Sequence, residues 1–229
     1  MILSGKIALV TGATGGLGKE ISLSLANHGC YMVLLGRNRD KLLSLQSEIG
    51  EDNCEIRTID LTSASEIKAM SEQVSADILI NCAGVFPINN IENTTLEEFD
   101  NCLNVNLRAP FLLTKYLTPH MIQSGWGRVV NIASSSAYAG FKGTSTYCSS
   151  KHGLLGLSRS LYNELKEENV RVFCVSPGSI QTPMGETIKD QDYSTFMDPR
   201  DISDFITKII SYDSNMIPEE TRLNRVIIR

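Results

Sequence analysis

The chain has 229 residues, of which 42% are hydrophobic, and its 21 basic and 26 acidic side chains give a net charge of −5. At about 100–200 residues per domain, this length predicts one large or two small domains, and the composition is typical of folded globular proteins. The two signs of charge are scattered along the sequence. A basic face that binds nucleic acid is therefore not expected.

The six cysteines stand singly, at positions 30, 54, 82, 102, 148 and 174, without the paired spacing of a zinc site. This usage favours reduced thiols and a cytoplasmic location over disulfides, and it predicts no metal site. Gly5 and Lys6 interrupt the N-terminal apolar run, which makes it too short for a signal peptide. Because no apolar run approaches the about 20 residues of a membrane span, we expect no membrane partner.

Short β-rich runs alternate with longer helical segments along the chain. We expect strands at 7–10, 31–35, 54–59, 77–80, 128–133 and 170–175, with a seventh candidate from Arg225 to Ile228. We expect helices at 17–29, 38–49, 63–75, 95–123, 147–168 and 199–211. The alternation predicts an α/β fold in which a doubly wound, Rossmann-like parallel sheet lies between two helical layers. With no repeat or linker in the sequence, residues 1–229 are expected to form a single domain, with a polar loop near 178–197.

The segment TGATGGLG, from Thr11 to Gly18, falls between the first strand and the first helix. Glycines at such a turn let the backbone approach a pyrophosphate, which the helix amides and the helix dipole then bind. The segment has neither the GxGxxG spacing nor the P-loop pattern, and it fits TGxxxGxG through Thr11, Gly12, Gly16 and Gly18. This interpretation predicts a dinucleotide cofactor, and the alternative is an ordinary glycine-rich turn.

The second strand ends in LLGRNRD, which decides the expected type of dinucleotide. An acidic residue about 20 positions after the glycines is typical of NAD, because it binds the ribose 2′-hydroxyl, whereas an arginine suits the 2′-phosphate of NADP. Here Gly36 is followed by Arg37 and Arg39, and a guanidinium grips a phosphate through two hydrogen bonds. The sequence therefore favours NADP(H) over NAD(H), with a solvated loop charge as the alternative for Arg37.

The sequence YCSSK places Tyr147 and Lys151 four residues apart in a helical stretch, and hence on one face. A nearby ammonium favours the ionised phenol, whose unperturbed pKa is about 10. Tyr147 is then a candidate proton donor to a carbonyl oxygen, or acceptor from an alcohol. Ser134, after the preceding strand, is a candidate to orient the substrate oxygen, and Ser135 and Ser136 compete for that role.

In their order along the chain, these motifs resemble the single-domain form of the short-chain dehydrogenase/reductase family. The resemblance extends from about Gly5 to Met184 and is carried by TGATGGLG at 11–18, Asp60-Leu61, NCAG at 81–84, Asn106 in NVN, Ser134, Tyr147 with Lys151, and PGSIQTP at 177–183. It implies one NAD(P)-binding, Rossmann-like domain over residues 1–229, with 178–197 as the substrate loop.

The resemblance implies a role for each matched residue. Tyr147 is expected to be the catalytic acid/base, with Lys151 lowering its pKa and binding the nicotinamide ribose. Ser134 is expected to stabilise the substrate oxygen, and Asn106 to anchor a water relay to the lysine. The implied cofactor site comprises Gly12, Thr14, Gly16, Leu17, Gly18, Arg37, Asp60, Leu61, Asn81, Ala83, Gly84, Tyr147, Lys151, Pro177, Gly178, Ile180 and Thr182. The cofactor carries the hydride, while the protein orients it and moves the proton.

The resemblance implies reduction of a ketone or oxidation of a secondary alcohol, and Arg37 favours NADP(H) as the cofactor. Reductases of 3-oxoacyl thioesters are the nearest analogy. The alternatives are a reductase of a sugar derivative or small ketone, and a non-catalytic regulator that binds NADP. Cys82 departs from the family's NNAG pattern, and its small size predicts no loss of function. The final EETRLNRVIIR lacks the Gly-Gly pair of many relatives, which makes the family's usual tetramer less secure. We expect a homodimer or homotetramer.

Overall fold

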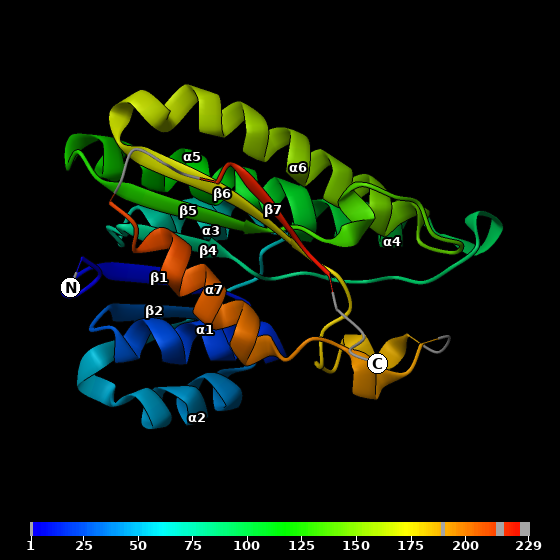
Figure 1. The fold of residues 1–229 in the computed structure, drawn as a ribbon, viewed down its shortest axis with the longest axis horizontal. Coiled ribbons are helices and arrows are strands. Elements are labelled where there is room, and N and C mark those ends of the chain that lie inside the picture. Colours follow the sequence, from blue (N-terminus) through cyan, green and yellow to red (C-terminus); the bar gives the residue numbers. More distant parts are fainter. Residues whose placement is uncertain (1, 189–190, 214–217, 225–229) are drawn as a thin grey trace.

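A parallel sheet of seven strands forms the centre of the molecule in residues 2–188, 191–213 and 218–224, the part of the chain that the computed structural model describes (Figure 1). Its strand order is β3-β2-β1-β4-β5-β6-β7. The strands are β1 (Ile7–Thr11), β2 (Tyr31–Gly36), β3 (Cys54–Thr58), β4 (Ile78–Asn81), β5 (Gly127–Ile132), β6 (Val170–Pro177) and β7 (Glu220–Leu223).

Helices cover both faces of this sheet (Figure 1). One layer holds α1 (Gly16–Asn27), α2 (Arg39–Ile49) and α7 (Pro199–Ile210). The other holds α3 (Ala64–Ser71), α4 (Leu96–Leu103), α5 (Ala109–Gln123) and α6 (Ser145–Leu165). The α/β, doubly wound, three-layer architecture predicted from the sequence is confirmed.

Each central strand contributes to two hydrophobic cores, because successive side chains of a strand point to opposite faces. On β1, Ala8 and Val10 are buried under the layer of α1 and α7, whereas Leu9 is buried under α3 and α5. Both β5 and β6 are buried along their whole length. This two-sided burial explains why the strands read as continuous apolar runs.

The chain reverses its direction of winding between β1 and β4, which are hydrogen-bonded neighbours in the sheet. From β1 the chain proceeds outward through β2 and β3, and it then crosses back to start β4 on the other side. In folds of this kind, the loops that leave the carboxyl ends of two such strands in opposite directions border a ligand-binding crevice. The functional site is therefore expected at the carboxyl edge of the sheet.

The predicted helix at 95–123 is interrupted in the structure. A π-helical turn, Asn104–Arg108, separates α4 from α5, and the Ala109 N–H donates to the carbonyl of Asn104, five residues back. Pro110 has no N–H, so it gives the carbonyl of Asn106 no α-helical hydrogen bond. The apolar pattern continues through the turn, which is why periodicity alone predicts one long helix.

The seventh strand also differs from the prediction. The candidate from Arg225 to Ile228 lies outside the described residues, and the edge strand is formed by Glu220–Leu223, which pairs with β6. Arg159 of α6 donates two hydrogen bonds, of 2.8 and 3.1 Å, to the carboxylate of Glu220. This segment reads as polar in the sequence because an edge strand is exposed to water along one side.

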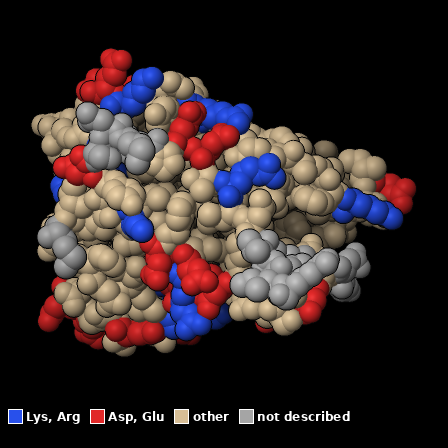
Figure 2. All heavy atoms as spheres, viewed as in Figure 1, with Lys and Arg blue, Asp and Glu red and all other residues tan. Residues whose placement is uncertain are grey.

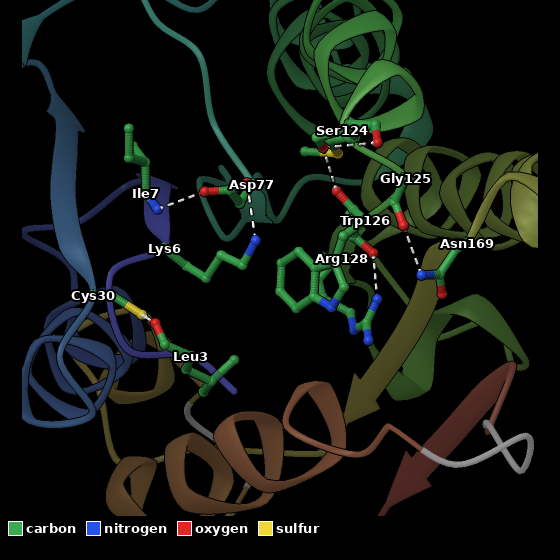
Figure 3. Close-up of polar contacts among 12 residues, drawn as sticks. Leu3, Lys6, Ile7, Cys30, Asp77, Ser124, Gly125, Trp126, Arg128 and Asn169 are labelled. Atoms are coloured by element: carbon green, nitrogen blue, oxygen red, sulfur yellow. Dashed lines mark hydrogen bonds and ion pairs between the residues drawn. The ribbon is translucent and has the colours of Figure 1, made fainter. Parts of the chain in front are cut away.

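The amino edge of the sheet carries a cluster of cations around Trp126 (Figure 3). The ring of Trp126 has Lys6 Nζ 4.3 Å and the guanidinium carbon of Arg128 4.2 Å from its centre. Asp77 accepts from the Ile7 N–H at 2.9 Å and pairs with Lys6 at 3.5 Å. Cation–π contacts of this kind stabilise the start of β1, β4 and β5 at the end of the sheet opposite the crevice.

On the face drawn in Figure 2, acidic and basic side chains lie interspersed, and no broad patch of one sign is visible there. None of the helices in the described residues is long and apolar enough to cross a membrane. All six cysteines lie within the described residues and are free thiols.

Candidate functional site

The start of α1 lines the crevice with backbone amides. This helix begins at Gly16, after Gly15, and no side chain caps its N-terminus. Uncapped N–H groups at a helix start, together with the helix dipole, bind an anionic group such as a pyrophosphate. The turn that the sequence singles out is therefore available for phosphate binding at the position where the strands diverge.

Three glycines of this turn allow close packing that a side chain would prevent. At Gly12, which has φ +65°, a Cβ would lie 2.8 Å from the Ala83 Cα. At Gly16, a Cβ would lie 2.6 Å from the Thr182 Cγ2, and at Gly18 it would meet the carbonyl oxygen of Gly12. The structure thus brings together the glycine turn, the end of β4 and the loop after β6, as the motif predicts for a dinucleotide cradle.

Thr11, at the end of β1, links that strand to the NCAG segment after β4. Its hydroxyl oxygen accepts hydrogen bonds of 3.0 Å from both the Cys82 and the Ala83 N–H, and donates to the carbonyl of Ile80 at 3.3 Å. The end of β1 is thereby fastened to the NCAG segment, and Cys82 is accommodated beside it. Sequence reasoning used Thr11 only as part of the glycine pattern, so this anchoring role was missed.

Arg37 and Asp60 mark the far end of the crevice, after β2 and β3. Both side chains are exposed. Hydrogen bonds from the Thr62 N–H and hydroxyl, both 2.9 Å, lower the pKa of Asp60, and the nearby charge of Arg37 lowers it further. The predicted phosphate-binding arginine therefore lies within electrostatic reach of the predicted adenine contact, with its guanidinium in solvent.

The buried pair of Tyr147 and Lys151 occupies the first turns of α6, on the opposite side of the crevice from α1. Lys151 Nζ donates to the carbonyl of Ile132, at the end of β5, at 2.7 Å, and lies 5.7 Å from the centre of the Tyr147 ring. Lys151 is 4% exposed and Tyr147 is 8% exposed, so both titratable groups are withdrawn from water. Ser134 follows the same end of β5.

Burial decides the protonation of this pair. It raises the pKa of Tyr147 to about 12, and a hydrogen bond with Ser134 acts in the opposite direction. Burial also lowers the pKa of Lys151 to about 8. The two charges that act on the phenol, those of Cys102 and Cys148, also raise its pKa, and the role that the resemblance implies for Lys151 stays a prediction. The raised pKa keeps the phenol of Tyr147 neutral near pH 7, and Ser134, rather than Ser135 or Ser136, is the serine that acts on it.

Asn106 belongs to the π-helical turn and is 1% exposed. Its Oδ1 accepts from the Val85 N–H at 2.9 Å, and its Nδ2 donates to the Val85 carbonyl and to Ser150 Oγ, both at 3.0 Å. The side chain therefore clamps the segment after NCAG onto α6. A Cβ on Gly84 would lie 3.4 Å from Asn106 Oδ1 and 3.9 Å from Lys151 Nζ, so these three predicted residues are neighbours.

Asn81 ends β4 and faces the sheet interior. Its Nδ2 donates to Asn131 Oδ1 at 2.8 Å, and Asn131 donates to Ser158 Oγ at 2.9 Å. The chain of amides and hydroxyl links β4 and β5 to α6, so Asn81 supports the scaffold beneath the crevice. Its Oδ1 is buried without a hydrogen-bond partner.

The loop near 178–197 folds back on itself in its described part. The Gln181 N–H donates to the Met197 carbonyl at 2.9 Å, and the Met197 N–H donates to the Ser179 carbonyl at 3.0 Å. In the same loop, Thr182 lies against Gly16 of the glycine turn. The remaining predicted positions lie along the same edge: Thr14 and Leu17 at α1, Leu61 after β3, and Pro177 and Gly178 at the end of β6.

No group of three or more His, Cys, Asp or Glu side chains that could hold a metal ion occurs in the part of the chain that the structure describes. A doubly wound sheet whose glycine-lined helix start faces a buried Tyr–Lys pair defines a class of protein, the dinucleotide-binding α/β oxidoreductases. The family model described as short chain dehydrogenase matches residues 6–193. The chain belongs to this family.

Several relatives share its full length. The 3-oxoacyl-[acyl-carrier-protein] reductase of Rickettsia bellii is 31% identical over 229 residues, which cover 96% of this chain and 95% of that protein. A 3-ketoacyl-(acyl-carrier-protein) reductase from Brucella melitensis, solved with NADH, superposes with a TM-score of 0.89 at 27% identity, covering 97% of each chain. A metagenomic short-chain oxidoreductase, solved with NADP, has a TM-score of 0.87 at 30% identity, covering 100% of each chain.

Proposed function

We propose that this chain is an NADP(H)-dependent oxidoreductase that transfers a hydride between the nicotinamide and a ketone or secondary alcohol, with a 3-oxoacyl thioester as the favoured substrate. The observation that carries the proposal is the placement of the buried Tyr147–Lys151 pair, with Ser134, at the same sheet edge as the glycine-lined start of α1. The proton donor then reaches the oxygen of a substrate carbonyl whose carbon faces the dinucleotide cradle.

NADP(H) is favoured over NAD(H) because the exposed guanidinium of Arg37 follows β2, where a 2′-phosphate is bound in this fold. The tight packing at Gly12, Gly16 and Gly18 fits the pyrophosphate, and Asp60, Leu61, Ala83, Ile180 and Thr182 complete the proposed cofactor site. Of the two solved relatives above, one was obtained with NADP and the other with NADH. Arg37 is therefore the residue on which the preference is tested.

In the proposed reduction, the carbonyl oxygen of the substrate accepts hydrogen bonds from Ser134 Oγ and Tyr147 Oη. When bound, the reduced cofactor supplies the hydride to the carbonyl carbon. Tyr147 donates its proton to the oxygen as the C=O double bond becomes a single bond. Lys151, held by the Ile132 carbonyl, stabilises the tyrosinate that remains and returns a proton to it. Asn106 keeps the NCAG segment closed over the lysine.

The substrate preference rests on the 3-oxoacyl reductases among the relatives and on the match along the whole chain. Self-association through α4, α5 and α6 into a homodimer or homotetramer is proposed in addition. Large apolar side chains on α4 and α5 are exposed, among them Leu96 at 82% and Phe111 at 46%. A cytoplasmic location is proposed from the free thiols.

The test follows the absorbance of reduced nicotinamide with NADPH and NADH across 3-oxoacyl thioesters, keto-sugar nucleotides and small diketones. We expect turnover with NADPH, fastest with the thioesters, and its loss in Tyr147→Phe, because that variant lacks the proton. Turnover retained in Tyr147→Phe refutes the acid/base assignment. Tight NADPH binding without turnover on any substrate supports the non-catalytic regulator instead.

A further inference from the structure

Hydrogen bonds hold the backbone next to Phe86 in place. Phe86 follows Val85, whose N–H and carbonyl are both bonded to the buried amide of Asn106 at 2.9 and 3.0 Å. The backbone directly before Phe86 is therefore held in place by the side chain of Asn106. The loop after β4 is thereby held in register with α6.

The ring of Phe86 packs directly against the ring of Tyr147. The two ring centres are 4.6 Å apart and the planes meet at 69°, which is the edge-to-face arrangement that aromatic pairs favour. The backbone of Tyr147 is held by α6, but its ring is free to turn about its side-chain bonds unless neighbours restrain it. Ser134 restrains the hydroxyl end, and Phe86 restrains the ring.

The surroundings of the Tyr147 phenol favour its neutral form. The titratable groups that act on the phenol from the surrounding elements are Cys102 of α4 and Cys148 of α6, both of which raise its pKa. Lys151, one turn further along α6, is itself buried and held by Ile132. Exclusion of water is the largest influence on the phenol, and an aromatic ring packed against it contributes to that exclusion.

We propose that Phe86 is a positioning residue for Tyr147, which fixes the orientation of the phenol ring and shields it from water through the edge-to-face contact. This inference rests on the proposed function, because it assigns Phe86 to the residue that donates the proton. Phe86→Ala is expected to misorient the phenol and admit water to it, whereas Phe86→Tyr keeps the ring and its contact. The contact is supplied by a loop residue outside the serine, tyrosine and lysine pattern.

The first test is independent of turnover. Tyrosinate absorbance is followed against pH for each protein and for the same protein with Tyr147→Phe added. The difference between the two curves is the titration of Tyr147, one of the seven tyrosines of the parent chain. Burial raises the pKa of Tyr147 to about 12 in the parent protein. In Phe86→Ala we expect this titration to move down by about one pH unit, because water then solvates the ionised form. Phe86→Tyr should leave the midpoint of the Tyr147 titration unchanged.

The second test uses turnover. In Phe86→Ala, kcat for carbonyl reduction should fall about tenfold or more with little change in KM for NADPH, because the donor is misplaced while the cofactor cradle is intact. The alkaline limb of the pH profile should move to lower pH, and Phe86→Tyr should restore both. Phe205→Ala is the matched control, since Phe205 packs on α7 against the core on the other face of the sheet.

An unshifted Tyr147 titration in Phe86→Ala, or an equal shift in Phe205→Ala, overturns the inference, because the effect is then absent or only general loosening. If no substrate is turned over by the parent protein, the proposed function fails while the titration still decides the role of Phe86.

Discussion

Replacing Asn106 by alanine tests the clamp that holds the segment after NCAG against α6. The change removes one acceptor contact and three donor contacts from a residue that is 1% exposed. It leaves the Val85 N–H without a partner and the Val85 carbonyl with only a 4.0 Å contact from the Cys102 thiol, and each lost hydrogen bond costs about 1–3 kcal/mol when water is excluded. Because Val85 is half-buried, water recovers part of that cost, and we expect a net loss of about 2–4 kcal/mol of unfolding free energy.

The assay is chemical denaturation followed by the fluorescence of Trp126, the single tryptophan of the chain. Asn104→Ala is the matched control, since Asn104 lies in the same π-helical turn and makes one bond, of 3.3 Å, to the exposed Arg108. Both variants gain the same helix propensity, so their difference isolates the clamp. If Asn106→Ala is no less stable than Asn104→Ala, the clamp is not holding the loop and the reasoning fails.

Three further predictions concern charge. Arg37→Asp should lower the affinity for NADPH relative to NADH about tenfold or more, as measured by cofactor fluorescence titration, because a charged hydrogen bond to the 2′-phosphate is replaced by repulsion. Burial lowers the pKa of Lys151 from 10.5 to about 8. Between these two pH values the unfolded chain binds more protons than the folded chain, so the contribution of Lys151 to the unfolding free energy should rise with pH. Unfolding free energies of the parent protein and Lys151→Met against pH isolate it. Arg128→Ala should lower the free energy of unfolding in denaturant by about 3–5 kcal/mol, because a fully buried guanidinium stacked on Trp126 is lost. Asp213→Asn should lower it by about 1 kcal/mol or less, because that carboxylate is exposed.

Each of these has a contradicting result. An unchanged preference between the two cofactors in Arg37→Asp removes the basis for NADP(H). Parallel pH curves for the parent protein and Lys151→Met show that the lysine is not desolvated. Equal losses in Arg128→Ala and Asp213→Asn show that the stability of the amino edge lies in the ion pair rather than in the stacked guanidinium.

The sequence predicted the doubly wound parallel sheet because short apolar strands alternate with helices, and it placed the motifs after those strands, whose carboxyl ends share one edge. Gly12, Gly16 and Gly18 were recognisable since only glycine tolerates the contacts they make. The π-helical turn was not, because the apolar pattern continues through Asn104–Arg108 and only Pro110 signals a missing hydrogen bond.

Side-chain partners were less predictable than backbone positions. The sequence places Asn106 and Asn81 in the family pattern, but their bonds to Val85 and Asn131 join residues 21 and 50 positions apart. The protonation of Tyr147 depends on how completely the fold excludes water, which spacing to Lys151 does not reveal. Phe86 carries no motif signal, because its contact with Tyr147 arises only when the loop after β4 packs against α6.

The edge strand β7 offers a practical route to altering substrate range. The Gly178 N–H, at the entrance of the loop near 178–197, donates to the Leu223 carbonyl at 2.9 Å, and Pro177 stands opposite Leu223 in the sheet. A mutational library restricted to Glu220–Leu223 leaves Tyr147 unaltered, but it shifts Pro177 and Gly178, which belong to the proposed cofactor site. Measuring KM for NADPH beside the substrate panel therefore separates changes in substrate range from changes in cofactor binding.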